Sequence, residues 1–196
     1  MNLLERINEQ FNDSAQTKLR VLESLAMPIA ESIELLARAL LDERKIIACG
    51  NGSSAAAAQH FTSLLVNRFE RQRPPLAALA LSADSAALTA IANEGDYSRV
   101  FAKQIEALGR PGDVLVAIST SGNAANVLTA IEAAHDQGML VVALTGHEGG
   151  EIANTLQPQD LHVCVPHDSA TRIREVHSLT LHCFCDGIDA LLIGVD

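Results

Sequence analysis

Two short polar segments of the chain have the residue types of an anion-binding loop. They run from Cys49 to Ser54 and from Ile118 to Asn123, and each follows an apolar run and precedes a helical pattern. A strand that leads into hydroxyls and bare backbone amides at a helix N-terminus forms a cradle for an anion. The helix dipole and Ser or Thr hydroxyls supply the attraction, so no lysine is required. The segments therefore predict a site for phosphate on a small molecule.

The same segments lack the fingerprints of nucleotide-binding loops. Neither contains Gly-x-x-x-x-Gly-Lys-Ser/Thr, and neither places Gly-x-Gly-x-x-Gly at a first strand-to-helix turn. ATP and NAD are therefore poor candidates for the ligand. The alternative interpretation is that Ser and Gly are simply common in loops and helix caps. Two such loops in one strand-loop-helix context favour the functional interpretation.

The composition predicts one domain with an aliphatic core. The chain has 196 residues, 48% of them hydrophobic and 3% aromatic, with no Trp, which suits helices packed on a parallel sheet. Its net charge of −10 argues against direct nucleic-acid binding, which uses clustered Lys and Arg. The basic stretch 68–73 contains Glu70, and we interpret it as a solvated loop.

The cysteines and the N-terminal region indicate a reducing compartment. Four cysteines show no paired CxxC spacing, and reduced cysteine in apolar runs behaves as a small hydrophobe. The first residues carry charges and no apolar stretch of signal length, and no run approaches the roughly 18 apolar residues of a membrane span. We expect a cytoplasmic protein without a membrane partner.

Apolar periodicity predicts two N-terminal helices, over 3–24 and 27–42, with a possible break at 12–14. Unbroken apolar runs then alternate with helical stretches, the pattern of strands covered on both faces. The expected fold is α/β, a three-layer sandwich with a five-stranded parallel sheet and helices on both faces. Strands are expected at 45–49, 76–81, 113–118, 139–144 and 161–165, and helices at 54–69, 84–93, 98–108, 123–136 and 169–193.

We expect 1–196 to form a single domain with its ligand site beyond the carboxyl ends of the strands, where both Ser-rich loops lie. The opening segment, 1–42, is apolar on one face. It is expected to pack on another subunit as well as on its own sheet, although covering the sheet within one monomer would explain the same pattern.

Several motifs along the chain resemble the sugar isomerase (SIS) domain, which has a flavodoxin-like fold. The likeness is greatest to the phosphoheptose isomerase group and its relative DiaA, the DnaA initiator-associating protein. The motifs that carry the resemblance are Cys49-Gly-Asn-Gly-Ser-Ser, Ala58-Gln-His-Phe, Asn67-Arg-Phe-Glu, Ala90-Ile-Ala-Asn, Ser119-Thr-Ser-Gly-Asn, Ala143-Leu-Thr-Gly and Arg172-Ile-Arg-Glu-Val-His.

The resemblance implies a cluster of metal and carboxylate groups that this sequence retains only in part. The family pattern has His with Glu four residues later, and Gln eight residues before a second His. His60 and His182 match the two histidines, but Leu64 and Arg174 stand at the other two positions. An aliphatic side chain cannot move a proton, and a guanidinium beside a divalent cation is unfavourable. We therefore expect no catalytic residues and no cofactor, with zinc on His60 and His182 only if the chain is an isomerase.

The sugar-phosphate pocket, by contrast, keeps its outline. Under the resemblance, the residues that would bind the phosphate and the sugar are Asn51, Gly52, Ser53, Ser54, Asn93, Glu94, Ser119, Thr120, Ser121 and Arg174.

The resemblance supports two main functional hypotheses. The first is a non-catalytic, sugar-phosphate-binding homotetramer resembling DiaA, which binds the DnaA initiator and regulates the start of chromosomal replication; Leu191, Leu192 and Ile193 are its candidate partner contact. The alternative is phosphoheptose isomerase, which converts sedoheptulose 7-phosphate to D-glycero-D-manno-heptose 7-phosphate for lipopolysaccharide core synthesis. A third, weaker possibility is a sugar-phosphate sensor without either role.

Overall fold

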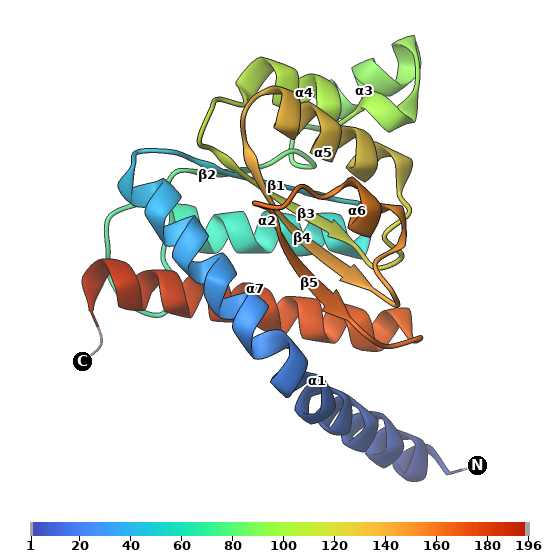
Figure 1. The fold of residues 1–196 in the computed structure, drawn as a ribbon. Coiled ribbons are helices and arrows are strands. Elements are labelled where there is room, and N and C mark those ends of the chain that lie inside the picture. Colours follow the sequence, from blue (N-terminus) through green and yellow to red (C-terminus); the bar gives the residue numbers. More distant parts are fainter. Residues whose placement is uncertain (1, 195–196) are drawn as a thin grey trace.

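A five-stranded parallel sheet lies between two layers of helices in the computed structural model, which describes residues 2–194 (Figure 1). The strand order is β2-β1-β3-β4-β5, and every neighbouring pair is parallel. This arrangement confirms the predicted α/β three-layer fold. The strands are β1 (Ile46–Gly50), β2 (Ala78–Ala80), β3 (Val114–Ser119), β4 (Leu140–Gly146) and β5 (Leu161–Val165).

The helices divide between the two faces of the sheet because successive strand side chains point to opposite sides. Ile46 and Ala48 pack in one core with α1, α2 and α7, whereas Ile47 and Cys49 pack in the other with α4, α5 and α6. The helical elements are α1 (Leu3–Leu41), α2 (Ser53–Val66), α3 (Ser85–Glu94), the 3-10 turn η1 (Tyr97–Arg99), α4 (Ala102–Leu108), α5 (Ala125–Asp136), α6 (Gly150–Thr155) and α7 (Ala170–Ile193).

The N-terminal region is one helix of 39 residues, so the prediction of two separate helices, over 3–24 and 27–42, is wrong, and so is the possible break at 12–14. Asn, Asp and Ser often end helices because their side chains compete for nearby backbone groups. Here Asp13 and Ser14 instead bond to side chains of α7. Pro28 lies inside the helix, and the Ser32 hydroxyl donates to its carbonyl oxygen at 2.6 Å.

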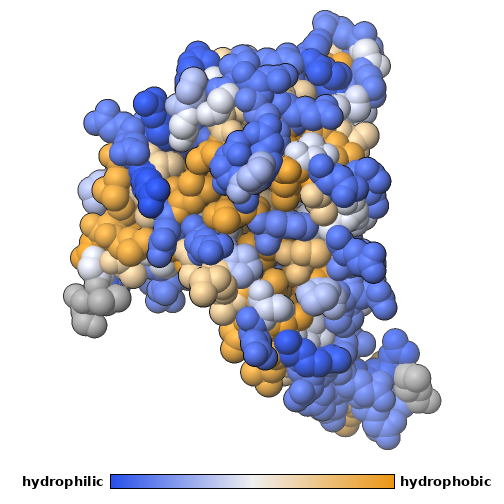
Figure 2. Space-filling view, viewed as in Figure 1, coloured by the Kyte–Doolittle hydropathy of each residue, from blue (hydrophilic) through white to orange (hydrophobic). Residues whose placement is uncertain are grey.

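Helix α1 packs on α7 and β5, while its first turns project beyond the sheet (Figure 1). Figure 2 shows apolar side chains along the part of α1 that crosses the molecule. Packing on a second subunit, as predicted for the segment 1–42, would cover such side chains and stays a prediction. The exposed large apolar residues of α1 are Leu3, Leu4, Ile7, Phe11, Leu19, Leu22, Met27 and Leu41.

The basic stretch after α2 is not simply a solvated loop, because Arg73 is buried. Its Nε donates to Asp189 Oδ1 of α7 at 2.5 Å, and the side chains of both residues are at most 5% exposed. The same guanidinium donates to the carbonyl oxygens of Leu64 and Leu65 at the end of α2. Arg73 therefore ties the end of α2 to α7.

Helix α7 is the one helix among residues 2–194 that is long and apolar enough to cross a membrane by length and composition. It lies against α1, α2 and the sheet, and it carries the buried polar residues Arg172, His177 and Asp189. A core helix of a globular domain has the same composition, so α7 gives no clear membrane span.

Candidate functional site

The two predicted polar loops meet at the carboxyl edge of the sheet, where β1 and β3 end and α2 begins. They enclose a cavity of about 260 Å³, which we call the anion cradle. Its position agrees with the general rule that open α/β sheets bind ligands beyond their strand ends. The cradle is lined by Asn51, Gly52, Ser53, Ser54, Ile118, Ser119, Thr120, Ser121, Ala124 and Arg174.

Two glycines allow close packing at the cradle: Gly50 between its two walls, and Gly122 between the second loop and the turn before α6. A Cβ on Gly50 would lie 2.8 Å from the Ile118 carbonyl oxygen and from Ser54 Cβ. Gly122 has a φ of +68°, and a Cβ there would lie 1.9 Å from the Gly149 carbonyl oxygen. Larger residues at these positions would push the loops apart.

Asn123 braces the second loop from outside the cradle. Its Oδ1 accepts from the Glu151 backbone N–H at 2.9 Å, and its Nδ2 donates to the Ser121 carbonyl oxygen at 3.1 Å. The Ile152 N–H also donates to the Gly122 carbonyl oxygen. These contacts join the loop to α6, a short helix that is not among the predicted elements.

Asn51 holds the first loop through a buried partner that sequence reasoning missed. The amides of Asn51 and Asn126 donate to each other, at 2.7 and 2.8 Å. The Asn51 side chain is therefore engaged in structure, and its contribution to the cradle wall is chiefly geometric. The sequence does place an Asn in the first turn of the helix over 125–136. An Asn at such a position is common for other reasons, so it did not identify Asn126 as the partner of Asn51.

The cradle presents hydrogen-bond donors without protein acceptors. In the described part of the chain, the hydroxyls of Ser53, Ser54, Ser119 and Thr120 make no hydrogen bond. Helix α2 starts beside them at Gly52 with no side chain capping its first turn. Uncapped helix amides and free hydroxyls together attract a negatively charged group.

Arg174 adds a full positive charge to the cradle. It extends from the second turn of α7, is exposed and lines the cavity. Within residues 2–194 it forms no hydrogen bond and no ion pair. Its neighbour Glu175 bonds to Arg172 and Ser14 instead. The guanidinium of Arg174 is thus available to an anion in the cradle.

The two family histidines, His60 on α2 and His182 on α7, lie side by side. Their Nε2 atoms are 3.4 Å apart, and their ring centroids are 5.6 Å apart. The Phe69 ring is 5.8 Å from the His182 ring, and together they border an open groove of about 380 Å³. We call His60 and His182 the histidine pair.

Leu64 follows the histidine pair by one turn of α2 and packs against the core beneath it. Its surroundings are apolar, so no carboxylate replaces the family's Glu from this position. Residues 2–194 contain no group of three or more His, Cys, Asp or Glu arranged to hold a metal ion. Zinc prefers four donors or three donors with water. The two imidazoles of one chain therefore do not fit a zinc site.

The anion cradle and the histidine pair lie at two levels of the same pair of helices. Helices α2 and α7 are in contact, with Ser53 and Arg174 near their beginnings and His60 and His182 farther along. Seven residues separate Ser53 from His60, which is about 10 Å along a helix. A ligand held at the cradle must be of that length to reach both imidazoles.

Other predicted site residues lie apart from the cradle. Asn93 and Glu94 are at the exposed end of α3 and do not line the cavity. At the end of α7, Leu191 and Ile193 are exposed, whereas Leu192 packs against the core. The structure therefore brings together the loop residues and Arg174 but leaves Asn93 and Glu94 outside.

His177 is a buried histidine of α7 that faces the sheet. Its Nε2 lies 2.8 Å from the Thr145 carbonyl oxygen, and its Nδ1 has no partner among the described residues. Burial lowers the pKa of His177 to about 4, although the Thr145 contact acts in the opposite direction. The ring is therefore neutral at pH 7 and holds the end of β4.

Comparisons with known proteins give one family throughout. The SIS domain family matches residues 10–146. Phosphoheptose isomerases of Azoarcus sp. strain BH72 and Thiobacillus denitrificans are 60% and 54% identical over 196 residues, covering all of both chains in each case.

Two solved structures of similar sequence are also phosphoheptose isomerases. The phosphoheptose isomerase of Neisseria gonorrhoeae is 46% identical, with a TM-score of 0.92 over 96% of this chain and 100% of the other. The phosphoheptose isomerase of Francisella tularensis is 45% identical, with a TM-score of 0.93 over 96% of this chain and 99% of the other.

These findings contradict the predicted non-catalytic scaffold that resembles DiaA. The relatives match over their full length and are phosphoheptose isomerases, and none of those described above points to DnaA binding or replication initiation. The prediction rested on two side chains, Leu64 and Arg174. Two exchanged side chains remove particular contacts, but they leave the cradle and both histidines in place, and the scaffold prediction is wrong.

Proposed function

The chain belongs to the SIS domain family, and from this premise we propose that it is a phosphoheptose isomerase. The proposed reaction interconverts sedoheptulose 7-phosphate and D-glycero-D-manno-heptose 7-phosphate, in the synthesis of the lipopolysaccharide core. The observation that carries the proposal is the anion cradle, whose hydroxyls and Arg174 guanidinium have no protein acceptor within residues 2–194, in a chain that is 60% identical to a phosphoheptose isomerase.

The spacing of the site supports a long sugar phosphate as ligand. With the phosphate in the cradle, the chain of the sugar can run along α2 toward His60, about 10 Å away. In a heptose 7-phosphate the phosphate and the reacting carbons C1 and C2 are at opposite ends. A phosphate on C7 therefore directs C1 and C2 toward the histidine pair.

The histidine pair supplies the proton transfers in this proposal. Aldose-ketose exchange passes through an enediol, which requires a base for the carbon-bound proton and a donor for the oxygen. One imidazole takes the proton from carbon, and the other donates its proton to the carbonyl oxygen. The first imidazole then returns its proton to the neighbouring carbon of the enediol, and the second takes a proton back from the hydroxyl on the other enediol carbon, so both rings regain their starting states. The 3.4 Å between the two Nε2 atoms places both groups at the same pair of carbons.

We propose no resident metal for this chemistry. Two observations on the described residues support this proposal: Leu64 stands at the family's carboxylate position, and Arg174 lines the cradle. Each step above is accordingly assigned to a residue of this chain. The cradle holds the phosphate, and the histidine pair moves the protons.

The proposal also covers the partners of the chain and its location. The ligand is a phosphorylated sugar, the chain forms a homotetramer in the cytoplasm, and neither nucleic acid nor a membrane is a direct partner. The exposed apolar face of α1 and the net charge of −10 support these assignments.

The test is turnover of sedoheptulose 7-phosphate, followed by NMR with the purified protein. The assay is run after treatment with a chelator and again with added zinc, and unphosphorylated sedoheptulose is the control substrate. We expect conversion of the phosphorylated sugar only, at equal rates in both metal conditions. Phosphate binding without turnover in either condition would overturn the isomerase assignment, and faster turnover with zinc would overturn the metal-free one.

A further inference from the structure

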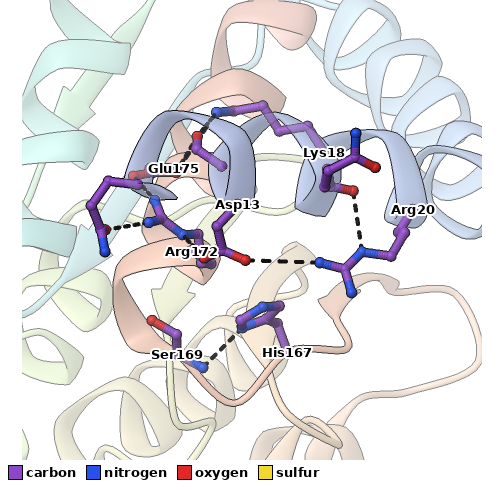
Figure 3. Close-up of polar contacts among 10 residues, drawn as sticks. Asp13, Lys18, Arg20, His167, Ser169, Arg172 and Glu175 are labelled. Atoms are coloured by element: carbon purple, nitrogen blue, oxygen red, sulfur yellow. Dashed lines mark hydrogen bonds and ion pairs between the residues drawn. The ribbon is translucent and has the colours of Figure 1, made fainter. Parts of the chain in front are cut away.

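The acidic residue next to Arg174 in sequence is held away from the cradle. Glu175 Oε1 accepts from Arg172 Nη1 at 2.6 Å, and Oε2 accepts from the Ser14 hydroxyl at 2.6 Å (Figure 3). The Lys18 ammonium lies 3.7 Å from the same Oε2. Glu175 is therefore bonded toward α1, and its charge is matched by two cations other than Arg174.

Arg172 is the centre of this arrangement. It is 4% exposed, and its Nε donates to Asp13 Oδ2 at 2.6 Å while Nη2 donates to Gln10 Oε1 (Figure 3). The hydrogen bond that Arg172 donates to Asp13 raises the pKa of Arg172 above its usual value, and the bond that it donates to Glu175 acts in the same direction. We call Gln10, Asp13, Ser14, Lys18, Arg172 and Glu175 the α1–α7 network.

The carboxylates of the network are ionised at neutral pH. Burial alone would raise the pKa of Glu175, but hydrogen bonds from Ser14 and Arg172, with the charges of Arg172 and Lys18, outweigh it and lower the pKa. The hydrogen bond from Arg172 likewise lowers the pKa of Asp13. The pairing is therefore one of full charges.

The two arginines at the beginning of α7 differ sharply in their partners. Both lie near the positive end of the dipole of a helix that begins at Ala170, where a cation is unfavourable without an anion nearby. Arg172 has two carboxylates, whereas Arg174 has no partner within residues 2–194 and lines the cradle. Of the two, Arg174 is therefore the arginine placed to pair with an anion in the cradle.

We propose that Arg172 is a positioning residue for the anion site. By holding and neutralising Glu175 on the α1 side, it keeps a carboxylate away from Arg174 and leaves that guanidinium free for the dianionic phosphate of a phosphate monoester. This inference rests on the proposed function for its ligand class. The affinity of the cradle for phosphate then depends on the α1–α7 network, although no residue of that network lines the cavity.

The test measures the affinity of inorganic phosphate and of sedoheptulose 7-phosphate by titration calorimetry. In R172M, Glu175 keeps its charge without its main partner, and we expect the affinity for both ligands to fall about tenfold. In R172M/E175Q, that charge is removed and most of the affinity returns. The control R68M removes an exposed arginine that donates only to the Glu70 carbonyl oxygen, and it leaves affinity unchanged.

A double-mutant cycle with Arg174 tests the route of the effect. R174M alone weakens phosphate binding at least tenfold and removes most of its salt dependence. In the R174M background, adding R172M has little further effect because the group through which it acts is absent. Equal losses from R172M in both backgrounds, or no rescue by E175Q, would overturn the positioning role.

A milder variant covers the case in which R172M does not fold. K18M removes a partly exposed cation from Glu175 and should lower phosphate affinity about twofold, with recovery in K18M/E175Q. Unchanged affinity in K18M together with a nonfolding R172M would count against the proposal. The two proposals fail on different measurements. Absence of turnover refutes the isomerase assignment but leaves the role of Arg172 in phosphate binding unaffected. Additive losses of affinity in R172M and R174M refute the positioning role alone.

Discussion

The anion cradle and the histidine pair occupy the same two helices, yet they differ in how completely one chain builds them. The cradle gathers hydroxyls and one guanidinium from three segments, and within residues 2–194 the hydroxyls of Ser53, Ser54, Ser119 and Thr120 and the Arg174 guanidinium have no protein acceptor. The histidine pair consists of two imidazoles at an open groove, with Leu64 in place of the family's carboxylate. A site made from several weak donors tolerates the exchange of one side chain, whereas proton transfer depends on particular groups.

The largest expected effect separates these two roles. In H60Q or H182Q, kcat for sedoheptulose 7-phosphate should fall by about 10²- to 10⁴-fold, because a proton carrier is lost. Phosphate affinity should stay unchanged, because the cradle is intact. The control H135Q alters a histidine paired with Asp160, 2.7 Å away, and should keep wild-type kcat. A large loss of phosphate affinity in H60Q would contradict the separation.

Displacing the second loop of the cradle should destabilise the fold moderately and abolish phosphate binding. In G122V, the new side chain meets the Gly149 carbonyl oxygen, and the φ of +68° is unfavourable for valine. We expect a cost of about 3 kcal/mol in the free energy of unfolding and loss of phosphate binding. Chemical denaturation and calorimetry measure the two. G95A, with no atom within 4 Å of its Cβ, is the control, and normal binding by G122V would show that loop contact does not shape the cradle.

The support that His177 gives to the end of β4 should depend on pH. The folded-state pKa of His177 is about 4, below its unfolded value of 6.5, so the unfolded state binds more protons between these values. Stability from His177 is therefore complete above pH 6.5 and is lost as the pH falls toward 4. The total is about 3 kcal/mol.

Comparison of wild type with H177Q by urea unfolding from pH 4 to 7.5 isolates this term. The difference between the two curves should flatten above pH 6.5. A difference that is constant across the range would mean that the folded-state pKa of His177 is not depressed.

The smallest effect concerns single donors of the cradle. S119A removes one hydroxyl and should raise KM about fivefold without a change in kcat, since one neutral hydrogen bond contributes about 1 kcal/mol. S63A removes a hydroxyl that donates to the His60 carbonyl oxygen and lies outside the cavity, so it serves as the matched control. A fall in kcat in S119A would link the cradle to the chemical step.

Much of the fold could be predicted because its signals are local. Apolar runs located all five strands within two or three residues, and β5 was predicted at 161–165, where it lies. The two Ser-rich loops were placed at the same sheet edge, where the structure joins them. The predicted break at 12–14 failed because α7 supplies partners for Asp13 and Ser14.

The chemistry was harder to predict because it depends on which groups meet. Arg73 was interpreted as solvated, but its partner Asp189 is 116 residues away in sequence. The exchange at Leu64 and Arg174 was interpreted as loss of activity, whereas relatives over the full chain are phosphoheptose isomerases. The prediction gave those two positions more importance than the cradle residues and the two histidines that the chain keeps.

By itself, the sequence determined the parallel sheet, the position of its loops and the presence of phosphate-type donors, because strand hydrophobicity and loop composition are properties of neighbouring residues. Only the tertiary structure decided that Arg174 is free to meet an anion. That freedom depends on Glu175 bonding to Ser14, which is 161 residues away along the chain. No local pattern encodes such a pairing, since it forms only when α1 packs against α7.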